Sequence, residues 1–396
     1  IEVNDPDIIA ENSDGKVAPY LLNPAETRED RYTAFKDYEP EVVMMPRISF
    51  SFPISDEAQF FAHYDVLTQR PPERNRLDPT DYFFIENNVG GLLNNPDLKS
   101  EKTIDYELGF AQTLNLRSSL TLSAFYRELR DMIQVVNVAY AYPATYMTMG
   151  NVDFGTVKGF QASYDLRRTG NVSLTANYTL QFADGTGSSA TSGFSLVNTG
   201  MPNLRTMTPM SYDQRHSLTA TVDYRFASGK DYNGPVLFGK QIFSNAGANF
   251  IVTTGSGTPY SRQSNITQEA ASGINDRSVL DGEMFGSRLP WSTRINSQIS
   301  KRFDLEWDKK DGSKKRASLN VYLQIQNLLN TQNVMAVYRA TGNPNDDGYL
   351  TDATAQNDIE TKFDPQSFRD MYTIAVNNPN NYSMPRIMRL GVSLSF

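Results

Sequence analysis

Apolar and polar residues alternate along many short stretches of this chain, and turn-forming residues separate the stretches. The C-terminal stretch shows the pattern well, with Arg, Gly and Ser between its apolar positions, which are Met388, Leu390, Val392, Leu394 and Phe396. Successive side chains of a β-strand point to opposite faces, so such a stretch forms a strand with one apolar and one polar face. The sequence therefore predicts amphipathic strands along its whole length.

About eleven stretches carry this alternation, and no stretch has a convincing helical pattern. We expect strands over 46–54, 60–66, 103–114, 120–127, 160–166, 172–182, 218–226, 244–254, 291–303, from 317 to as far as 338, and in the C-terminal stretch. Segments rich in Gly, Pro, Asn and Asp separate them and read as loops. The prediction is an all-β protein.

Long and short connections alternate between these strands. The long ones are 68–102, 129–144, 183–215, 255–290 and 341–383, and the short ones are 55–57, 115–118, 168–171, 227–242 and 304–316. Antiparallel neighbours reverse direction, so all the long loops fall at one end of the sheet. This asymmetry is typical of transmembrane outer-membrane β-barrels, whereas a soluble sandwich or propeller would not sort its loops in this way.

The composition agrees with a barrel of amphipathic strands. Hydrophobic residues make up 39% of the chain and the mean hydropathy is −0.47, and no run of apolar residues is long enough for a membrane-spanning helix. The net charge of −8 argues against a nucleic-acid partner, and the absence of cysteine excludes disulfides and thiol chemistry. No nucleophile elbow, phosphate-binding loop or HExxH motif is present, so we expect no enzyme.

An odd number of strands does not make a complete bacterial barrel. Single-chain barrels have an even number of strands as a rule, with both termini on the periplasmic side. An open edge in lipid would leave backbone groups unpaired at a cost of several kcal/mol each. We therefore interpret the chain as the C-terminal half of a barrel of about twenty-two strands, a size typical of plugged transporters.

Short motifs along the chain carry a family resemblance. They are Asn95-Pro-Asp-Leu98 with Glu101, Tyr106-Glu-Leu-Gly109, Asp213-Gln-Arg-His216, Arg288-Leu-Pro290 leading to Ser300-Lys-Arg-Phe303, Asn327-Leu-Leu-Asn330 inside a strand, and Pro385-Arg386 with Leu390-Gly391 and Phe396. Over essentially its whole length, the chain resembles the C-terminal barrel portion of TonB-dependent outer-membrane receptors. The segments 341–350 and 378–385 also resemble Oar-like receptors of the Bacteroidota and Myxococcota type.

The resemblance implies an outer-membrane location in a Gram-negative bacterium and contact with outer-membrane lipid. Residues 1–396 would be the C-terminal part of the barrel, without the family's plug, TonB box and first strands, and coupling to TonB–ExbB–ExbD would run through that missing part. Because residue 1 is Ile rather than Met, we expect that a preceding segment has been removed or is not included. The terminal residues Val392, Leu394 and Phe396 would be the signal that the barrel-assembly machinery reads.

Two functions remain open at this point. In the first, the barrel is an active importer whose lumen and external loops bind a scarce solute. In the second, it is a structural or docking subunit of a surface or secretion complex, with a surface lipoprotein or secretion component as partner. The loops contain no clear aromatic platform for sugars and no cationic cluster for ferric siderophores, so the sequence does not specify the substrate.

One acidic segment could bind calcium. Oxygen-bearing side chains gather around Gly348, namely those of Asn343, Asn345, Asp346, Asp347 and Asp352, and Ca²⁺ prefers oxygen ligands. We name Asp346, Asp347 and Asp352 as the candidate ligands, and expect no other cofactor. A solvated turn explains the same residues more simply.

Two further features have a structural interpretation. The histidines, His63 and His216, lie on or beside strands next to polar residues, and we favour a hydrogen-bonded structural role over a catalytic or ligand role. The glycine-containing segment 254–257 is expected to bend the top of a strand.

Overall fold

The computed structural model describes residues 40–72, 92–95, 97–138, 146–194, 197, 205–270, 278–308 and 314–396. Its main feature is a 13-stranded sheet, in which two short strands lie off the path and the other eleven pair antiparallel in sequence order. The eleven are β1 (Arg47–Pro53), β2 (Ala58–Gln69), β4 (Glu101–Asn115), β5 (Ser118–Val138), β6 (Tyr146–Thr169), β7 (Val172–Gly185), β9 (His216–Arg225), β12 (Ala246–Gly255), β15 (Ser292–Asp308), β16 (Lys314–Gln326) and β17 (Ile387–Ser395). The predicted all-β barrel fold is confirmed.

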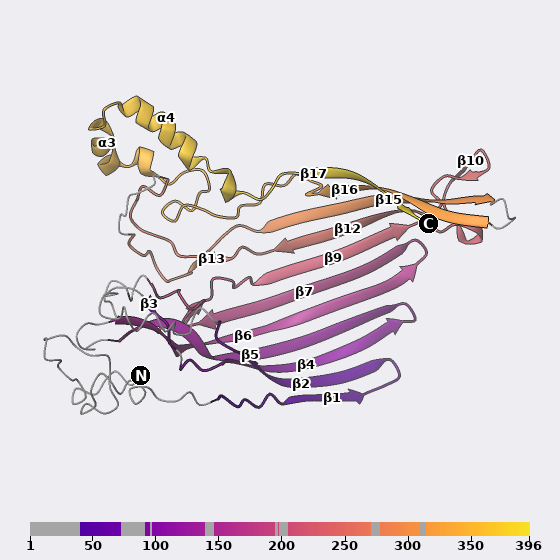
Figure 1. Ribbon diagram of the computed structural model, residues 1–396, viewed down its shortest axis with the longest axis horizontal. Coiled ribbons are helices and arrows are strands. Elements are labelled where there is room, and N and C mark those ends of the chain that lie inside the picture. Colours follow the sequence, from indigo (N-terminus) through magenta and orange to yellow (C-terminus); the bar gives the residue numbers. More distant parts are fainter. Residues whose placement is uncertain are drawn as a thin grey trace, which may run out of the picture.

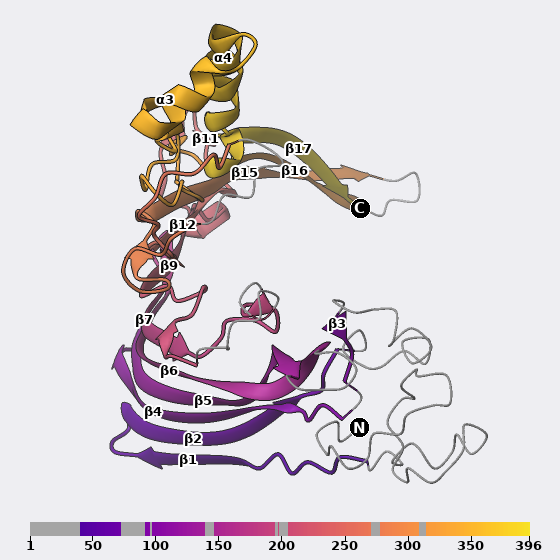
Figure 2. The same ribbon diagram turned by 90° about the vertical axis from the view of Figure 1, so that its left-hand side faces the viewer.

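The sheet curves into an open half-barrel, with β1 and β17 at the two ends of the curve (Figure 2). Among the described strands, β1 pairs with β2 alone and β17 with β16 alone. The helices and most long connections gather at one end of the strands, here called the long-loop end, and tight turns lie at the other, the short-turn end (Figure 1). The predicted sorting of loops holds, although the connection from β9 to β12 at the short-turn end carries its own small hairpin, β10 (Val236–Leu237) and β11 (Lys240–Gln241).

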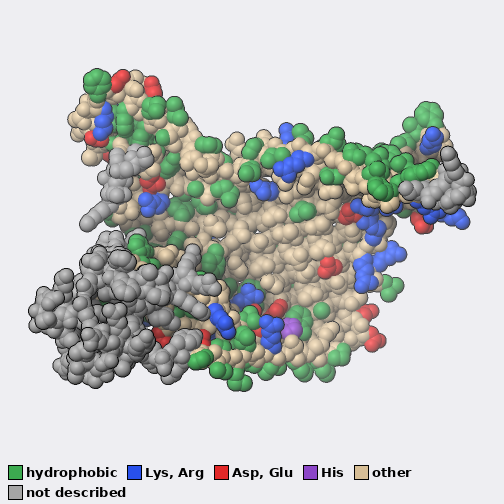
Figure 3. Space-filling view, viewed as in Figure 1, with side chains coloured by type: hydrophobic (Ala, Val, Ile, Leu, Met, Phe, Trp, Pro, Cys, Tyr) green, Lys and Arg blue, Asp and Glu red, His purple; other side chains and the backbone are tan. Residues whose placement is uncertain are grey.

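The strand register makes one face of the sheet predominantly apolar, with Lys158 and Lys301 among the charged exceptions. Residues paired across strands share a face, and the row Ile48, Tyr64, Tyr106 and Tyr126 crosses the first four strands. At the other edge, Val321 pairs with Val392, which is 63% exposed. Figure 3 looks onto the opposite, concave face, where polar side chains and backbone fill the centre of the sheet. A convex apolar face and a concave polar face are what a membrane barrel requires.

Three glycines on the concave face lie under aromatic rings of the neighbouring strand. The pairs are Phe61 with Gly109, Phe125 with Gly159, and Tyr322 with Gly391. A Cβ atom on Gly109 would lie 2.0 Å from the Phe61 ring, so any side chain there would displace the ring. Two of these glycines belong to the motifs 106–109 and 390–391, which the packing now explains.

A β-bulge corrects one expected loop. The segment 130–144 was expected to be a loop, but β5 continues to Val138 and β6 begins at Tyr146. Register shifts between Leu129 and Met132, and Asp131 has a left-handed φ of 56°. A bulge of this kind inserts an extra residue and shifts the alternation, which hid the second half of the strand from a period-two reading.

The structure contains two helices that the sequence pattern did not predict. Helix α3 (Ala353–Glu360) and helix α4 (Pro365–Val376) begin at the capping residues Asp352 and Asp364, which accept backbone N–H bonds. No helix in the part of the chain that the structure describes is long and apolar enough to cross a membrane.

The tenth strand, β16, ends at Gln326 rather than near residue 338. Asn327 and Asn330 both have a φ of 53°, a left-handed conformation that ends a strand. The motif 327–330 therefore forms a turn after the strand and does not lie inside it.

Replacing Val392 with Arg tests the assignment of the two faces. Because Val392 lies on the apolar face near mid-strand, Val392→Arg should destabilise the protein folded in a lipid bilayer by about 2–4 kcal/mol. The neighbouring Ser393→Arg, on the concave face, should be tolerated. Denaturant titration of both variants in vesicles measures the difference, and equal losses would mean that the register is wrong by one residue.

Candidate functional site

The concave face carries a row of charges that crosses four strands. Arg47, Asp65, Asp105 and Arg127 are successive cross-strand partners from β1 to β5. The Arg127 guanidinium donates to Asp105 Oδ2 at 2.9 Å, and Arg47 lies 4.0 Å from Asp65. Two carboxylates directly opposite each other repel, and the flanking arginines offset this repulsion. The inner face of the wall thus carries charged side chains of both signs.

Both histidines are hydrogen-bonded, as predicted. His63 lies on the concave face and shares a 3.0 Å bond with Ser49 Oγ. His216 pairs with Leu180 in register and so faces the apolar side. It shares a 2.8 Å bond with the Tyr178 hydroxyl and stacks on Trp291 at 5.4 Å between ring centroids. His216 is therefore part of an aromatic stack on the convex face.

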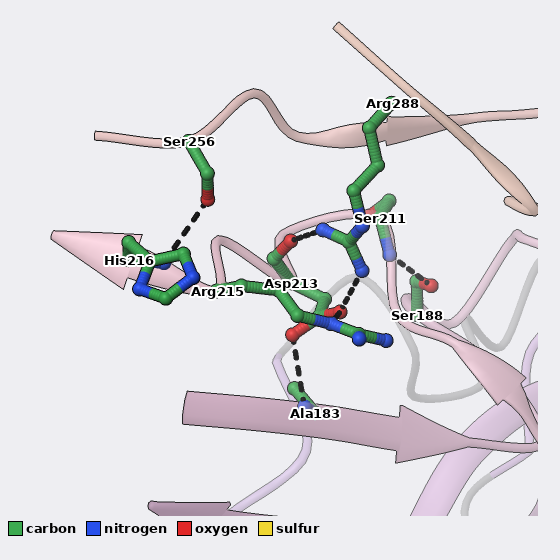
Figure 4. A network of polar contacts seen from close by, with 8 residues as sticks. All are labelled: Ala183, Ser188, Ser211, Asp213, Arg215, His216, Ser256 and Arg288. Carbon is green, nitrogen blue, oxygen red and sulfur yellow. Dashed lines mark hydrogen bonds and ion pairs between the residues drawn. The ribbon is translucent and has the colours of Figure 1, made fainter. Parts of the chain in front are cut away.

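A buried ion pair joins two distant connections at the long-loop end (Figure 4). Asp213 is fully buried, and its Oδ1 accepts a bond from Ala183 N at 3.0 Å. Arg288 donates both to Asp213 Oδ2 and, at 2.7 Å, to the Asp213 backbone carbonyl. Arg215 lies 3.5 Å from the same carboxylate. The two motifs that begin at Asp213 and Arg288 are thus a single joint, which fixes the connection before β9 to the connection before β15.

The glycines of segment 254–257 permit a close crossing beside this joint. Strand β12 ends at Gly255, and a Cβ on Gly257 would lie 1.8 Å from the Leu289 carbonyl oxygen. Ser256 Oγ accepts a bond from His216 N at 3.0 Å (Figure 4). The glycines let two backbones touch where the strand ends.

A methionine anchors the segment before β9 to the concave wall. Met210 is buried with Phe125, Val157 and Ala183. Its methyl group lies where a Cβ on Gly155 or Gly185 would be, at 2.3 and 2.2 Å. The adjacent strand β8 (Thr208–Pro209) pairs with the end of β7. No sequence pattern predicted this packing around Met210, because the residues that surround the side chain come from separate segments of the chain.

At the long-loop end, the paired strands β5 and β6 extend past their neighbours β4 and β7, and this extension is here called the arm. Ile133, Val135, Met147, Met149 and Val197 make up its small core.

Gln134 is buried inside this arm and is fully paired. Its Nε2 donates to Asp153 Oδ2 at 2.9 Å and to Ser192 Oγ at 2.7 Å, and its Oε1 accepts from Gly193 N at 3.2 Å. Paired polar groups of this kind specify one arrangement of the arm.

Helices α3 and α4 form a second folded unit at the long-loop end, here called the helical cap. Its core consists of Tyr338, Tyr349, Ala355, Ile359, Tyr372 and Val376. The Tyr372 hydroxyl donates to the buried Asp347 carboxylate. Burial, with this bond and the adjacent negative charge, raises the pKa of Tyr372 above its ordinary value. Tyr372 stays protonated at neutral pH, and the cap keeps its central hydrogen bond.

The three candidate calcium ligands have other bonds in this cap. Asp346 accepts from Gly348 N at 2.8 Å, Asp347 accepts from Tyr349 N at 3.0 Å, and Asp352 caps α3 by accepting from Ala355 N at 2.9 Å. Among the described residues, no three His, Asp or Glu side chains are grouped to hold a metal ion. Calcium binding by Asp346, Asp347 and Asp352 stays a prediction.

The terminal residues named as an assembly signal are accessible. Leu394 and Phe396 are 55% and 87% exposed, and Val392 and Leu394 lie on the apolar face of β17. Their recognition by the barrel-assembly machinery stays a prediction.

Removing Arg288 tests the buried joint. Arg288→Met leaves the Asp213 carboxylate buried beside Arg215 alone, and should lower the free energy of unfolding by about 3 kcal/mol, the lower end of the range for breaking a buried pair. In the control Arg262→Met, the pair with Asp281 is half-exposed at 3.7 Å and the loss should stay below about 1 kcal/mol. Thermal unfolding of both variants measures the difference, and similar losses would contradict a buried joint.

Comparison with solved structures finds matches of low sequence identity that cover a minor part of each solved chain. The ferripyoverdine receptor FpvA of Pseudomonas aeruginosa, solved with heterologous pyoverdines, is 10% identical with a TM-score of 0.48, and the match covers 89% of this chain and 32% of that one. The ferric-catecholate import receptor Fiu of Escherichia coli K12 is 13% identical with a TM-score of 0.47, and the match covers 89% of this chain and 35% of that one. The outer-membrane transporter YddB of Escherichia coli is 11% identical with a TM-score of 0.45, and the match covers 72% of this chain and 37% of that one. The chain thus spans about a third of the length of these proteins. No curated protein matches it.

A family model settles the relationship. Residues 22–328 match the model described as "TonB dependent receptor-like, beta-barrel", which covers most of the chain. The family consists of outer-membrane receptors and transporters of Gram-negative bacteria rather than enzymes. The narrower Oar-like type stays a prediction. This chain belongs to the family of TonB-dependent receptor β-barrels of the Gram-negative outer membrane.

Proposed function

We propose that the chain is the C-terminal part of the barrel of an active outer-membrane importer. The observation that carries this proposal is the two-faced sheet, whose convex side is predominantly apolar while its concave side is polar and charged. The convex side lies against lipid. The concave side lines the passage that the solute follows.

The open edges support the view that the chain is one part of a larger barrel. The described strands leave β1 and β17 each with a single neighbour, and in lipid the unpaired edges would cost several kcal/mol for each backbone group. Further strands that continue from both edges would close a barrel of about twenty-two strands. These strands, a plug and the site that couples to TonB–ExbB–ExbD would lie outside residues 1–396.

The long-loop end is the proposed entrance for the solute. The arm of β5 and β6 and the helical cap each have their own small core, and the joint at Asp213 fixes the segments between them. A binding surface that is already ordered loses little conformational entropy when the solute binds. The chemical class of the solute does not follow from these residues.

A docking role at the cell surface is the second candidate. Helix α4 points Phe368, Tyr372 and Val376 into the cap, but Met371 and Ile374 on its other side are 67% and 71% exposed. Exposed apolar residues on a helix are typical of a contact with another protein. Such a partner, for example a surface lipoprotein, would cover the cap.

Cysteine labelling on intact cells tests the proposed orientation. Asn357→Cys, on the exposed side of α3, should react with a membrane-impermeant thiol reagent, because the cap lies outside the cell. Gly170→Cys, in the exposed turn between β6 and β7, should react only after lysis. Both sites are exposed in the fold, so the membrane alone makes the difference, and the reverse labelling would overturn the orientation.

Intact mass and uptake together test the importer. The protein purified from outer membranes should have a mass well above the 44.5 kDa of residues 1–396, or should retain a second polypeptide. Deleting its gene should reduce uptake of a solute whose entry also requires TonB. A 44.5 kDa polypeptide that alone seals a barrel in liposomes would refute the partial-barrel proposal, and unchanged uptake of every solute tested would favour the docking role.

A further inference from the structure

A groove opens on the convex side of the sheet, immediately beyond its row of tyrosines. Tyr64, Tyr106 and Tyr126 stand side by side on the apolar face, with ring centroids 5.3 and 6.3 Å apart. Such rows lie at the boundary between hydrocarbon and headgroups. The next convex-facing residue of β5 towards the long-loop end is Glu128, followed by Arg130. Apart from Lys158, which is the cross-strand partner of Tyr126, the charged convex-facing side chains of these strands begin there, so the groove lies at the level of the lipid headgroups.

The lining of the groove combines aromatic rings with carboxylates. The groove has a volume of about 510 Å³, and its walls include Tyr126, Glu128, Arg130, Asp131 and Phe154. Phe154 is 47% exposed, so its ring is available for stacking. Both bonds from Arg130 go to Oε2 of Glu128, so Oε1 of Glu128 and the carboxylate of Asp131 can accept hydrogen bonds from hydroxyl groups.

The groove is held in shape from behind. Asn151 Nδ2 donates to the Asp131 carbonyl at 2.7 Å and to the Lys99 carbonyl at 2.9 Å, and Asn151 Oδ1 accepts from Lys99 N at 2.8 Å. The backbone of Phe154 is tied to Thr186 by bonds of 3.0 and 3.1 Å. The bulge at Asp131 is therefore fixed, and the groove exists before any ligand binds.

We infer that this groove binds the sugar headgroup of a glycolipid in the outer leaflet. A sugar presents an apolar C–H face to an aromatic ring and hydroxyl donors to carboxylates. A phosphate fits less well, because the guanidinium of Arg130 in the lining is already paired with Glu128 and Asp131 adds negative charge. An acyl chain would leave these charged groups unused. The inference rests on the proposed orientation, which places this end of the barrel outside.

Site-directed crosslinking in living cells tests the inference. A benzophenone amino acid replaces Phe154, and the same residue at Phe160, deeper on the convex face and 39% exposed, reports on any lipid. A third site at Phe363, which is fully exposed on the cap, controls for random capture. We expect the glycolipid at Phe154, lipid at Phe160 and none at Phe363. The crosslinked lipid is identified by mass spectrometry.

Removing the carboxylates separates a sugar from a phosphate as the ligand. Glu128→Gln together with Asp131→Asn keeps the size of both side chains and should lower glycolipid capture at Phe154 about tenfold, since hydrogen bonds to charged groups are lost. An unchanged or increased yield would mean attraction of an anion to Arg130 and would overturn the sugar site.

Failure of the groove and failure of the orientation give different results. Lipid captured at Phe160 with none at Phe154 would refute the groove alone. Phospholipid without glycolipid at both positions would place this end in the inner leaflet, and would refute the proposed orientation as well.

Discussion

Backbone pairing in lipid is the constraint on which the rest of this structure depends. The hydrocarbon offers no water to an N–H or C=O group, so each one must find its partner inside the sheet. A meander in which each strand pairs with the next one in sequence meets this requirement with short turns. It also explains why the apolar face is continuous, since pairing in register places the alternating side chains of all strands on the same two sides.

The same constraint ends where the lipid ends. At the long-loop end, water can satisfy the backbone, and strands stop in left-handed residues such as Asn327 or continue past a bulge at Asp131. Order there comes from side chains instead. The carboxylate of Asp213, buried among donors from three segments, holds connections that the sheet no longer holds. The lipid-embedded part of the sheet is therefore regular, whereas the connections at the long-loop end are not restricted to a strand pattern.

The sequence predicted the features that a period of two imposes and missed those that depart from it. Strand number, order and loop sorting could be predicted because most positions on the convex face are apolar. The far half of β5 was missed since one extra residue at the bulge shifts the alternation. Helices α3 and α4 are short, and their core residues, such as Ile359 and Tyr372, stand among polar ones. The motifs at Asp213 and Arg288 were recognised, but their contact joins residues 75 positions apart, which no local pattern reveals.

The cores outside the sheet link this architecture to binding. A loop without packing would have to be ordered by the solute itself, at a cost in conformational entropy for every residue fixed. The helical cap avoids that cost by burying Ile359 and Val376 and by pairing Asp347 with Tyr372. The arm does so with Gln134, whose amide is bonded on both sides. Because both units are ordered by their own contacts, the packing of each one depends on residues outside the barrel wall, and substitutions on their exposed faces should leave the wall undisturbed.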